Sequence, residues 1–174
     1  MPLDLSPHLH AEGPWWHRIA LPASDLFDAL HAWEASASHG HGRRVARSVR
    51  GAKATTKAHC FDEIAAALQF PFYFGENWDA LHDCLSDLTW LHADTVLIAV
   101  IDSDRLLEHA PAEERDRFRV VVEEAMRCIT DLASQARSAH SRPPRSLHVL
   151  LHSEEAAAAA VEALWPETVP ISAP

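Results

Sequence analysis

Apolar residues follow two different patterns along the chain, and these patterns predict strands and helices in turn. Short apolar runs are typical of buried strands, whereas a period of about 3.6 residues is typical of helices. Runs of the first kind predict strands at residues 15–21, 45–49, 95–101 and 147–151. Segments of the second kind predict helices at residues 25–35, 61–68, 78–88, 112–138 and 154–164. Strands that alternate with helices predict an α/β fold with a mainly parallel sheet.

Residue types at the ends of these segments predict where elements begin and stop. Ser24 is the expected N-cap of the first helix and Asn77 that of the third, and Pro71 follows the end of the second. Residues 1–14 and the tail after Pro166 have no periodic pattern, so we expect both to be loose.

A segment rich in Ser, Gly and His, residues 36–42, predicts a linker after the first strand–helix unit. The apolar face of that unit is too small to bury alone. We therefore expect it to pack on the rest of the chain, with its strand beside residues 45–49 at the edge of the sheet.

The helix at residues 78–88 has two opposite faces. An apolar arc is formed by Trp78, Leu81, Cys84, Leu85 and Leu88. An acidic arc is formed by Asp79, Asp83 and Asp87, with His82 and Ser86 beside them. Like charges one turn apart cost about 0.2–0.5 kcal/mol per pair in an exposed helix. Such a surface fits a cationic partner.

Charge is distributed unevenly. The chain has a net charge of -10, and residues 61–131 carry sixteen acidic and five basic side chains. Between Lys57 and Arg105 there is no lysine or arginine, but there are nine acidic residues. Such acidity argues against nucleic acid as a ligand. It leaves a basic protein partner, a metal ion or a solvated face as interpretations.

Aromatic residues precede the acidic helix. They are Phe70, Phe72, Tyr73, Phe74 and Trp78. Some of them must belong to the core. One at the rim of the acidic arc would supply an interface contact, because large aromatic side chains dominate binding energy at interfaces.

Other chemistry is poorly supported. Glu76, Asp79 and Asp83 could hold Mg²⁺ through oxygen ligands, but no phosphate-cradling glycine loop or base lysine lies nearby. The chain also has no G-x-S-x-G, HExxH, GxGxxG or Walker motif. Three dispersed cysteines indicate reduced thiols rather than a disulfide framework or a zinc site. We expect no catalysis, no cofactor and no bound metal.

Two further features concern location and surface. No secretory signal and no apolar run of about 18 residues is present, so we expect a cytoplasmic protein that does not enter a membrane. Residues 43–57 carry six basic side chains and no acid. Nucleic-acid binding there is one interpretation, but no aromatic residue interleaves with the charges, and an exposed, charged sheet edge fits better.

The segment Phe72-Tyr-Phe-Gly-Glu-Asn-Trp-Asp-Ala-Leu-His-Asp-Cys-Leu resembles the signature of the barstar family, the inhibitors of barnase-type ribonucleases. The resemblance implies a small sheet of three parallel strands, or four with the N-terminal strand, packed with helices. It divides the chain into an N-terminal strand–helix extension (1–42), a barstar-like domain (43–152), and a C-terminal helix and tail (153–174).

The resemblance also implies a binding site and a role for each matched residue. In the family, an acidic helix and the loop before it block the basic cleft of the ribonuclease. Asp83 matches the aspartate that enters the phosphate-binding centre, and Asp79 matches a second interface aspartate. Tyr73, Gly75 and Asn77 match contact positions of the loop, and Glu124 matches a peripheral glutamate. We expect Asp87 to act as a rim charge.

The sequence departs from the family at two tryptophans. His82 stands before the key aspartate where the family has tryptophan, and Leu88 stands where a second tryptophan is found, with Trp90 nearby. These changes concern the identity of the target more than the binding mode.

Together these features predict a monomeric, non-enzymatic ribonuclease inhibitor that binds its target one-to-one. The expected partner is a basic extracellular-type ribonuclease or a related nuclease toxin. The alternatives are an acidic binding module for another basic protein and, third, a metal-dependent phosphoesterase.

Overall fold

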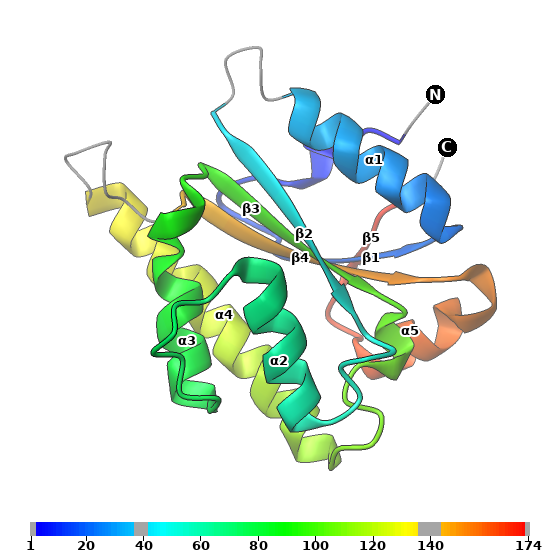
Figure 1. The fold of residues 1–174 in the computed structure, drawn as a ribbon. Helices are drawn as coiled ribbons and strands as arrows, with labels where there is room; N and C mark the ends of the chain where they lie inside the picture. The colour runs from blue at the N-terminus through cyan, green and yellow to red at the C-terminus, as the bar shows by residue number, and fades with distance from the viewer. Residues whose placement is uncertain (1–2, 37–41, 136–143, 173–174) are drawn as a thin grey trace.

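Five parallel strands form one sheet in the computed structural model, which describes residues 3–36, 42–135 and 144–172 (Figure 1). The strands are β1 (Trp16–Ala20), β2 (Arg44–Arg50), β3 (Thr95–Ile101), β4 (Ser146–Ser153) and β5 (Val169–Pro170). Their order in the sheet is β2-β3-β4-β1-β5, which puts β4 at the centre. Every residue of β4 is buried, as expected for a strand that is covered on both faces.

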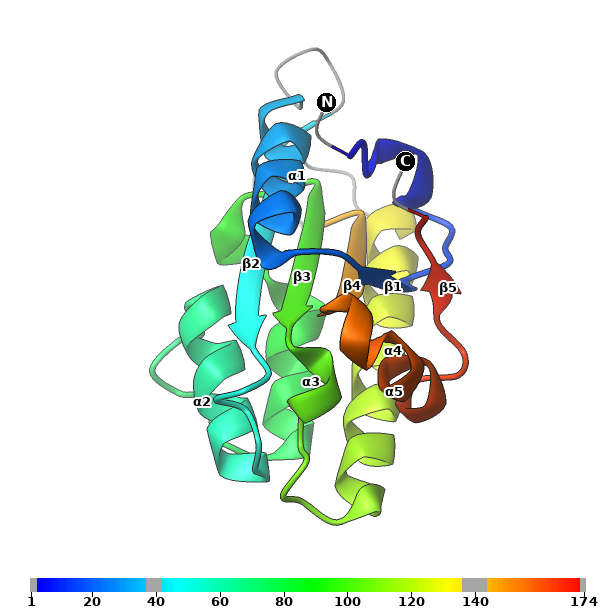
Figure 2. The same ribbon diagram turned by 90° about the vertical axis from the view of Figure 1, so that its right-hand side faces the viewer.

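Helices cover both faces of the sheet (Figures 1 and 2). One face carries α1 (Ala23–Ala35), and the other carries α2 (Lys57–Leu68), α3 (Trp78–Asp87) and α4 (Ala112–Gln135), while α5 (Ala158–Leu164) packs beside β1 and β4. Successive side chains of a strand point to opposite faces. Val96, Ile98 and Val100 of β3 therefore join the core under α2–α4, and Leu97 and Ala99 join the core under α1.

The predicted α/β class and parallel sheet are confirmed, but the predicted number of strands and one predicted neighbour are wrong. The N-terminal strand β1 does not border β2; it pairs with β4, with Trp16 opposite Val149. β5 pairs with β1 and brings the sheet to five strands. Hydrophobic periodicity identifies strands but does not identify their neighbours, and a strand of two residues has no period to detect.

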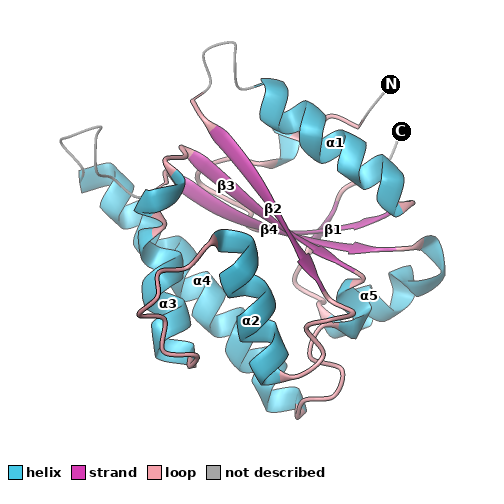
Figure 3. Ribbon diagram, viewed as in Figure 1, coloured by secondary structure: helices cyan, strands magenta, loops and turns pink. Residues whose placement is uncertain are grey.

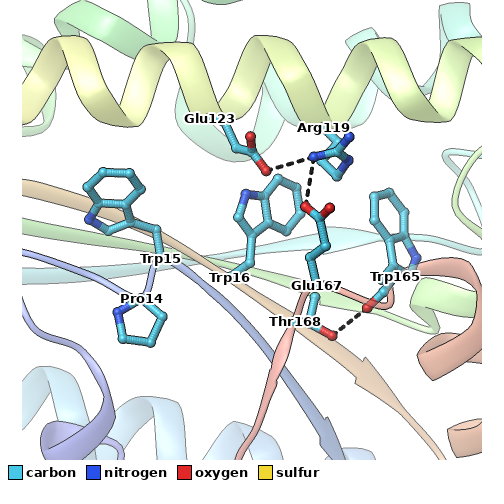
Figure 4. Close-up of a pocket in the computed structure, with 8 residues that line it drawn as sticks. All are labelled: Pro14, Trp15, Trp16, Arg119, Glu123, Trp165, Glu167 and Thr168. Carbon is cyan, nitrogen blue, oxygen red and sulfur yellow. Dashed lines mark hydrogen bonds and ion pairs between the residues drawn. The ribbon is translucent and has the colours of Figure 1, made fainter.

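The described residues near both termini are more ordered than predicted. Leu5, Trp165 and Ile171 are buried, and a short 3-10 helix covers Ser6–His8. The indole rings of Trp16 and Trp165 stack at 5.7 Å between centroids. Figure 4 shows this stack beneath α4, where Arg119 pairs with both Glu123 and Glu167. The terminal segments thus complete the core under α4. The boundaries at residues 42 and 152 stay predictions.

Three helix starts differ from prediction. α5 begins at Ala158 rather than at residue 154, after a 3-10 helix at Glu155–Ala157. The other two differ because of hydrogen bonds at the start of the helix. α1 begins at Ala23 and not at residue 25, and Ser24 is not its cap. The Ala23 backbone N–H donates instead to the carboxylate of Glu154 at 3.2 Å, a partner distant in sequence. α2 begins at Lys57, four residues earlier than expected, because the side chain of Thr56 caps it by accepting from the His59 N–H. The predicted end of α4 at residue 138 lies outside the described residues.

The expectation that the basic run forms a sheet edge is confirmed, since β2 is an edge strand. Several of its cations are paired within the molecule. Arg47 lies 3.8 Å from Glu34 of α1, and Arg50 Nε donates to Glu63 of α2 at 2.9 Å. These carboxylates compete with any polyanion for the same side chains. The pairing weakens the nucleic-acid interpretation of this edge.

Two histidine side chains are buried next to each other on the face of the sheet that carries α1. His17 of β1 and His148 of β4 are 1% and 0% exposed, and their rings are 5.7 Å apart. Burial lowers the pKa of His17 to about 4 and that of His148 to about 3, although the nearby Pro14 carbonyl opposes both shifts. Positive charge on the neighbouring His8 and His10 lowers the pKa of His17 further. Both rings are therefore neutral in the folded protein at neutral pH.

Because the pKa values of both histidines are lowered in the folded state, we predict that the free energy of unfolding falls as the pH is lowered from 6.5 to 4. The unfolded chain binds protons at both positions near its ordinary pKa of 6.5, whereas the folded chain does not. At about 1.4 kcal/mol per pKa unit, the loss is on the order of several kcal/mol. Urea unfolding of His148→Leu across this range should show a flatter dependence than the parent. His31→Leu, at an exposed position on α1, should keep the parent slope. Equal slopes for all three proteins would contradict the prediction.

Candidate functional site

The acidic helix α3 begins at a local cap, as predicted. The side chain of Asn77 accepts a hydrogen bond from the Ala80 N–H at 2.9 Å and donates one to the Gly75 carbonyl at 3.0 Å. Asn77 thus ties the preceding loop to the first turn of the helix. Asp79 lies in that first turn, where the helix dipole favours a negative charge.

The two predicted faces of α3 are confirmed, with one exception. The apolar arc is buried from Trp78 to Leu88, and Asp79, Asp83 and Asp87 are all exposed. Ser86 was expected beside the aspartates, but it is buried, with 8% of its surface exposed. It lies at the boundary between the two arcs, where a helical wheel does not decide on which side a small residue falls.

A half-buried charge holds α3 to its neighbours. The indole N–H of Trp78 donates to the carboxylate of Glu114 on α4 at 2.8 Å. Lys57 of α2 pairs with the same carboxylate at 3.3 Å, and its ammonium lies 5.4 Å from the centre of the Trp78 ring. This arrangement joins three helices at the first residue of α3, so the aspartates project from a fixed support.

A shallow depression lies between α3 and α4 and brings together four of the eight predicted site residues. Asp79, His82 and Asp83 line it from α3, and Glu124 lines it from α4. Glu124 is more than forty residues from Asp83 in sequence, but the fold brings both to the same depression; its contact with a partner stays a prediction. Asp87 is exposed one turn further along α3 and does not line the depression.

The sequence analysis missed a cation in this depression. Arg117 of α4 is exposed and lines it together with Val120. Among the described residues, no lysine or arginine forms an ion pair with Asp79, Asp83, Asp87 or Glu124, and the His82 ring lies 3.3 Å from the Asp83 carboxylate. Arg117 comes from the helix opposite, so no pattern within residues 58–104 could have revealed it.

The loop between α2 and α3 carries the remaining predicted contact positions. Residues 69–77 contain no helix or strand (Figure 3). Tyr73 is 64% exposed, and Gly75 and Asn77 are also exposed. Phe70 and Phe74 instead pack against the core, with their ring centres 5.0 Å apart. The loop therefore turns part of its aromatic content outward beside the acidic helix.

The two residues that stand in place of the family's tryptophans, His82 and Leu88, have different environments. His82 is about one-third exposed, and its Nδ1 lies 3.3 Å from a carboxylate oxygen of Asp83. Leu88 is fully buried. The nearby Trp90 is partly buried: its indole N–H donates to the Leu68 carbonyl and its ring packs against the core.

The described residues offer little support for other chemistry. They contain no cluster of three His, Cys, Asp or Glu side chains suited to a metal ion. Burial raises the pKa of the Cys60 thiol to about 12 and also raises that of Cys84, where Asp83 and Asp87 add to the effect. Both thiols are thus poor nucleophiles. None of the helices in the described ranges could cross a lipid bilayer.

Comparison with solved structures shows where this architecture recurs. The ADP form of the Aeropyrum pernix ORC2 protein aligns with a TM-score of 0.60 and 12% identity, over 95% of this chain and 44% of that chain. The ADPNP–ADP complexes of the same protein align with a TM-score of 0.56 and 13% identity, over 89% and 41%. The chain thus spans less than half of that protein, and at such identity the likeness concerns the fold alone. No curated protein matches the chain.

A protein-family comparison covers the segment that contains the site. The model of the family described as Barstar (barnase inhibitor) matches residues 45–152, which run from β2 to β4. The match includes the loop at residues 69–77, the acidic helix α3 and the part of α4 that carries Glu124. It spans well over half of the chain, and the chain belongs to the barstar family.

Proposed function

We propose that this protein inhibits a basic ribonuclease of the barnase type by binding it one-to-one and filling its active-site cleft with α3 and the preceding loop. Members of the barstar family are inhibitors rather than enzymes. The observation that carries the proposal is the convergence of Asp79, Asp83 and Glu124 on one exposed depression, on a helix that is anchored at its first residue.

The chemistry of the two surfaces is complementary. Arginine and lysine clusters that hold a phosphodiester also bind carboxylates, through the same charge-assisted hydrogen bonds. Carboxylates presented on a fixed helix lose little conformational freedom when they bind. In this proposal Asp83 occupies the phosphate centre and Asp79 binds one turn earlier. Tyr73, Gly75 and Asn77 provide the contacts of the loop.

The outer charges have a separate role in the proposal. Asp87 and Glu124 would act from the periphery, where charges mainly raise the association rate and its dependence on salt. The positive charge of Arg117 partly offsets the negative potential of the carboxylates at the depression. His82 would contact the enzyme at the position where the family has tryptophan.

An acidic module for a different basic protein is the second candidate, because the same carboxylates would fit any cationic cleft. Inhibition of a ribonuclease separates the two. A partner without nuclease activity would bind with salt-dependent affinity, but the chain would then leave ribonuclease activity unchanged.

We predict that Asp83 dominates inhibition and that Asp79 is second. Replacing Asp83 by alanine leaves the enzyme's cationic site buried without a partner, which should cost more than about 2 kcal/mol of binding free energy. Inhibition constants for Asp79→Ala, Asp83→Ala and Asp87→Ala, measured at two salt concentrations against a barnase-type ribonuclease, test this. Asp87→Ala should mainly slow association at low salt.

Asp25→Ala is the matched control, because Asp25 is an exposed carboxylate in the first turn of α1, on the opposite face of the sheet. It should inhibit like the parent. Folding should survive in the α3 variants, since each removes one of three like charges. If Asp83→Ala inhibits as well as the parent at both salt concentrations, the acidic arc is a solvated face and the proposal is wrong.

A metal-dependent phosphoesterase is the third candidate, and we predict that it fails a direct test. Calorimetric titration with Mg²⁺ or Mn²⁺ should give no stoichiometric site, because two exposed aspartates offer too few fixed oxygen ligands. Asp79→Asn/Asp83→Asn serves as the control for weak surface binding. A micromolar site that this variant loses, together with phosphodiester hydrolysis, would favour the enzyme.

A further inference from the structure

The most exposed aromatic side chain in the described residues is not among the contact positions that the family resemblance implies. Phe72 has a relative exposure of 102%, so it makes essentially no packing contact with the rest of the fold. Its ring lies edge-on to that of Tyr73, with centres 5.8 Å apart. Phe72 and Tyr73 together form an exposed aromatic pair. A phenylalanine here contributes nothing to the core, and aromatic side chains are enriched at protein–protein interfaces relative to the rest of the surface.

The backbone that carries this pair is held on both sides. Before it, the Phe70 N–H donates to the Ala65 carbonyl at 2.9 Å, and the Phe74 N–H donates to the Pro71 carbonyl at 3.0 Å across the turn. After it, the ring of Phe74 packs edge-on against Phe61 of the core. The exposed ring is therefore presented on an ordered loop, and little loop entropy is lost when a partner covers it.

The surroundings of Phe72 indicate what kind of partner would cover it. The loop leads directly into α3, so the chain presents the aromatic pair just before Asp79 and Asp83. These carboxylates disfavour an anionic membrane or a nucleic acid as the occupant. The partner must offer an apolar or aromatic surface immediately beside a cationic cleft. A ribonuclease has this combination, because it holds the base of its substrate, commonly by aromatic stacking, next to the phosphate it cleaves.

We propose that Phe72 occupies the base-stacking subsite of the same nuclease whose phosphate centre receives Asp83, and that it selects nucleases in which this subsite is aromatic. This inference rests on the proposed function of the acidic face. The phenyl ring replaces a nucleobase, while the carboxylate replaces a phosphate. The ring contributes short-range contact and the carboxylates contribute long-range attraction, so their effects on binding kinetics differ.

The first test compares Phe72→Ala with the parent against a barnase-type ribonuclease that the parent inhibits. We expect the inhibition constant to rise at least about tenfold through faster dissociation, with an unchanged salt dependence of association. Phe72→Trp should retain inhibition within about threefold, because indole also stacks. Phe27→Ala is the matched control, since Phe27 is 41% exposed on α1 across the sheet and should have no effect.

A second test places Phe72 in the enzyme's subsite. The aromatic residue on which the substrate base stacks is replaced by alanine in the nuclease. The parent inhibitor should then lose affinity, and Phe72→Ala should lose little more, so that the two changes are strongly non-additive. Additive losses would show that Phe72 binds elsewhere and would overturn the inference.

The same set of variants separates failure of the inference from failure of the proposed function. If Asp83→Ala weakens inhibition but Phe72→Ala does not, the chain is an inhibitor and Phe72 has no part in it. If neither change has an effect, the acidic face is not the inhibitory surface and the inference falls with the proposed function.

Discussion

The geometry of the candidate site depends on one hydrogen bond, from the Trp78 indole to the carboxylate of Glu114. Trp78 packs edge-on against Phe61 of α2 at 4.8 Å and also contacts Phe118 of α4. A half-buried carboxylate is costly without partners, and Glu114 has two, the indole and Lys57. Because this contact involves three helices, the direction of α3 is coupled to the packing of the core. The aspartates on the outer arc are positioned by it, although none of them takes part in it.

This anchoring accounts for how a helix with three like charges on one face remains in place. The exposed arc favours separation of its charges, whereas the buried arc is held by Leu81, Leu85 and Leu88, all without exposed surface. Burying an aliphatic side chain stabilises by about 1.5–3 kcal/mol, several times the repulsion between one pair of exposed charges. The balance leaves the charges available for a partner. A partner's cations would therefore reduce the repulsion between the aspartates as well as form new ion pairs with them.

The sequence alone was sufficient where the controlling interactions are local. The two arcs of α3 follow from its 3.6-residue period, and its start follows from Asn77, whose partners are only two and three residues away. Prediction failed where the start of a helix or the composition of the site depends on a residue that is distant in sequence. Glu154 caps α1 in place of Ser24, and Arg117 enters the depression from α4. Within residues 69–77 no period applies, so the outward direction of Phe72 and the inward direction of Phe74 could not be distinguished in advance.

The N- and C-terminal segments, which lie outside the family match at residues 45–152, pack away from the proposed binding face. β1 and β5 extend the sheet beyond β4, at the end opposite to β2. On α4, Arg119 and Glu123 face Glu167 of the C-terminal segment, whereas the adjacent Glu124 faces the depression beside α3. One helix therefore separates the two surfaces. The similarity in fold to a nucleotide-bound protein of 12% identity shows that this architecture does not specify a function. The functional argument rests instead on which side chains α3, α4 and the loop at residues 69–77 leave exposed together.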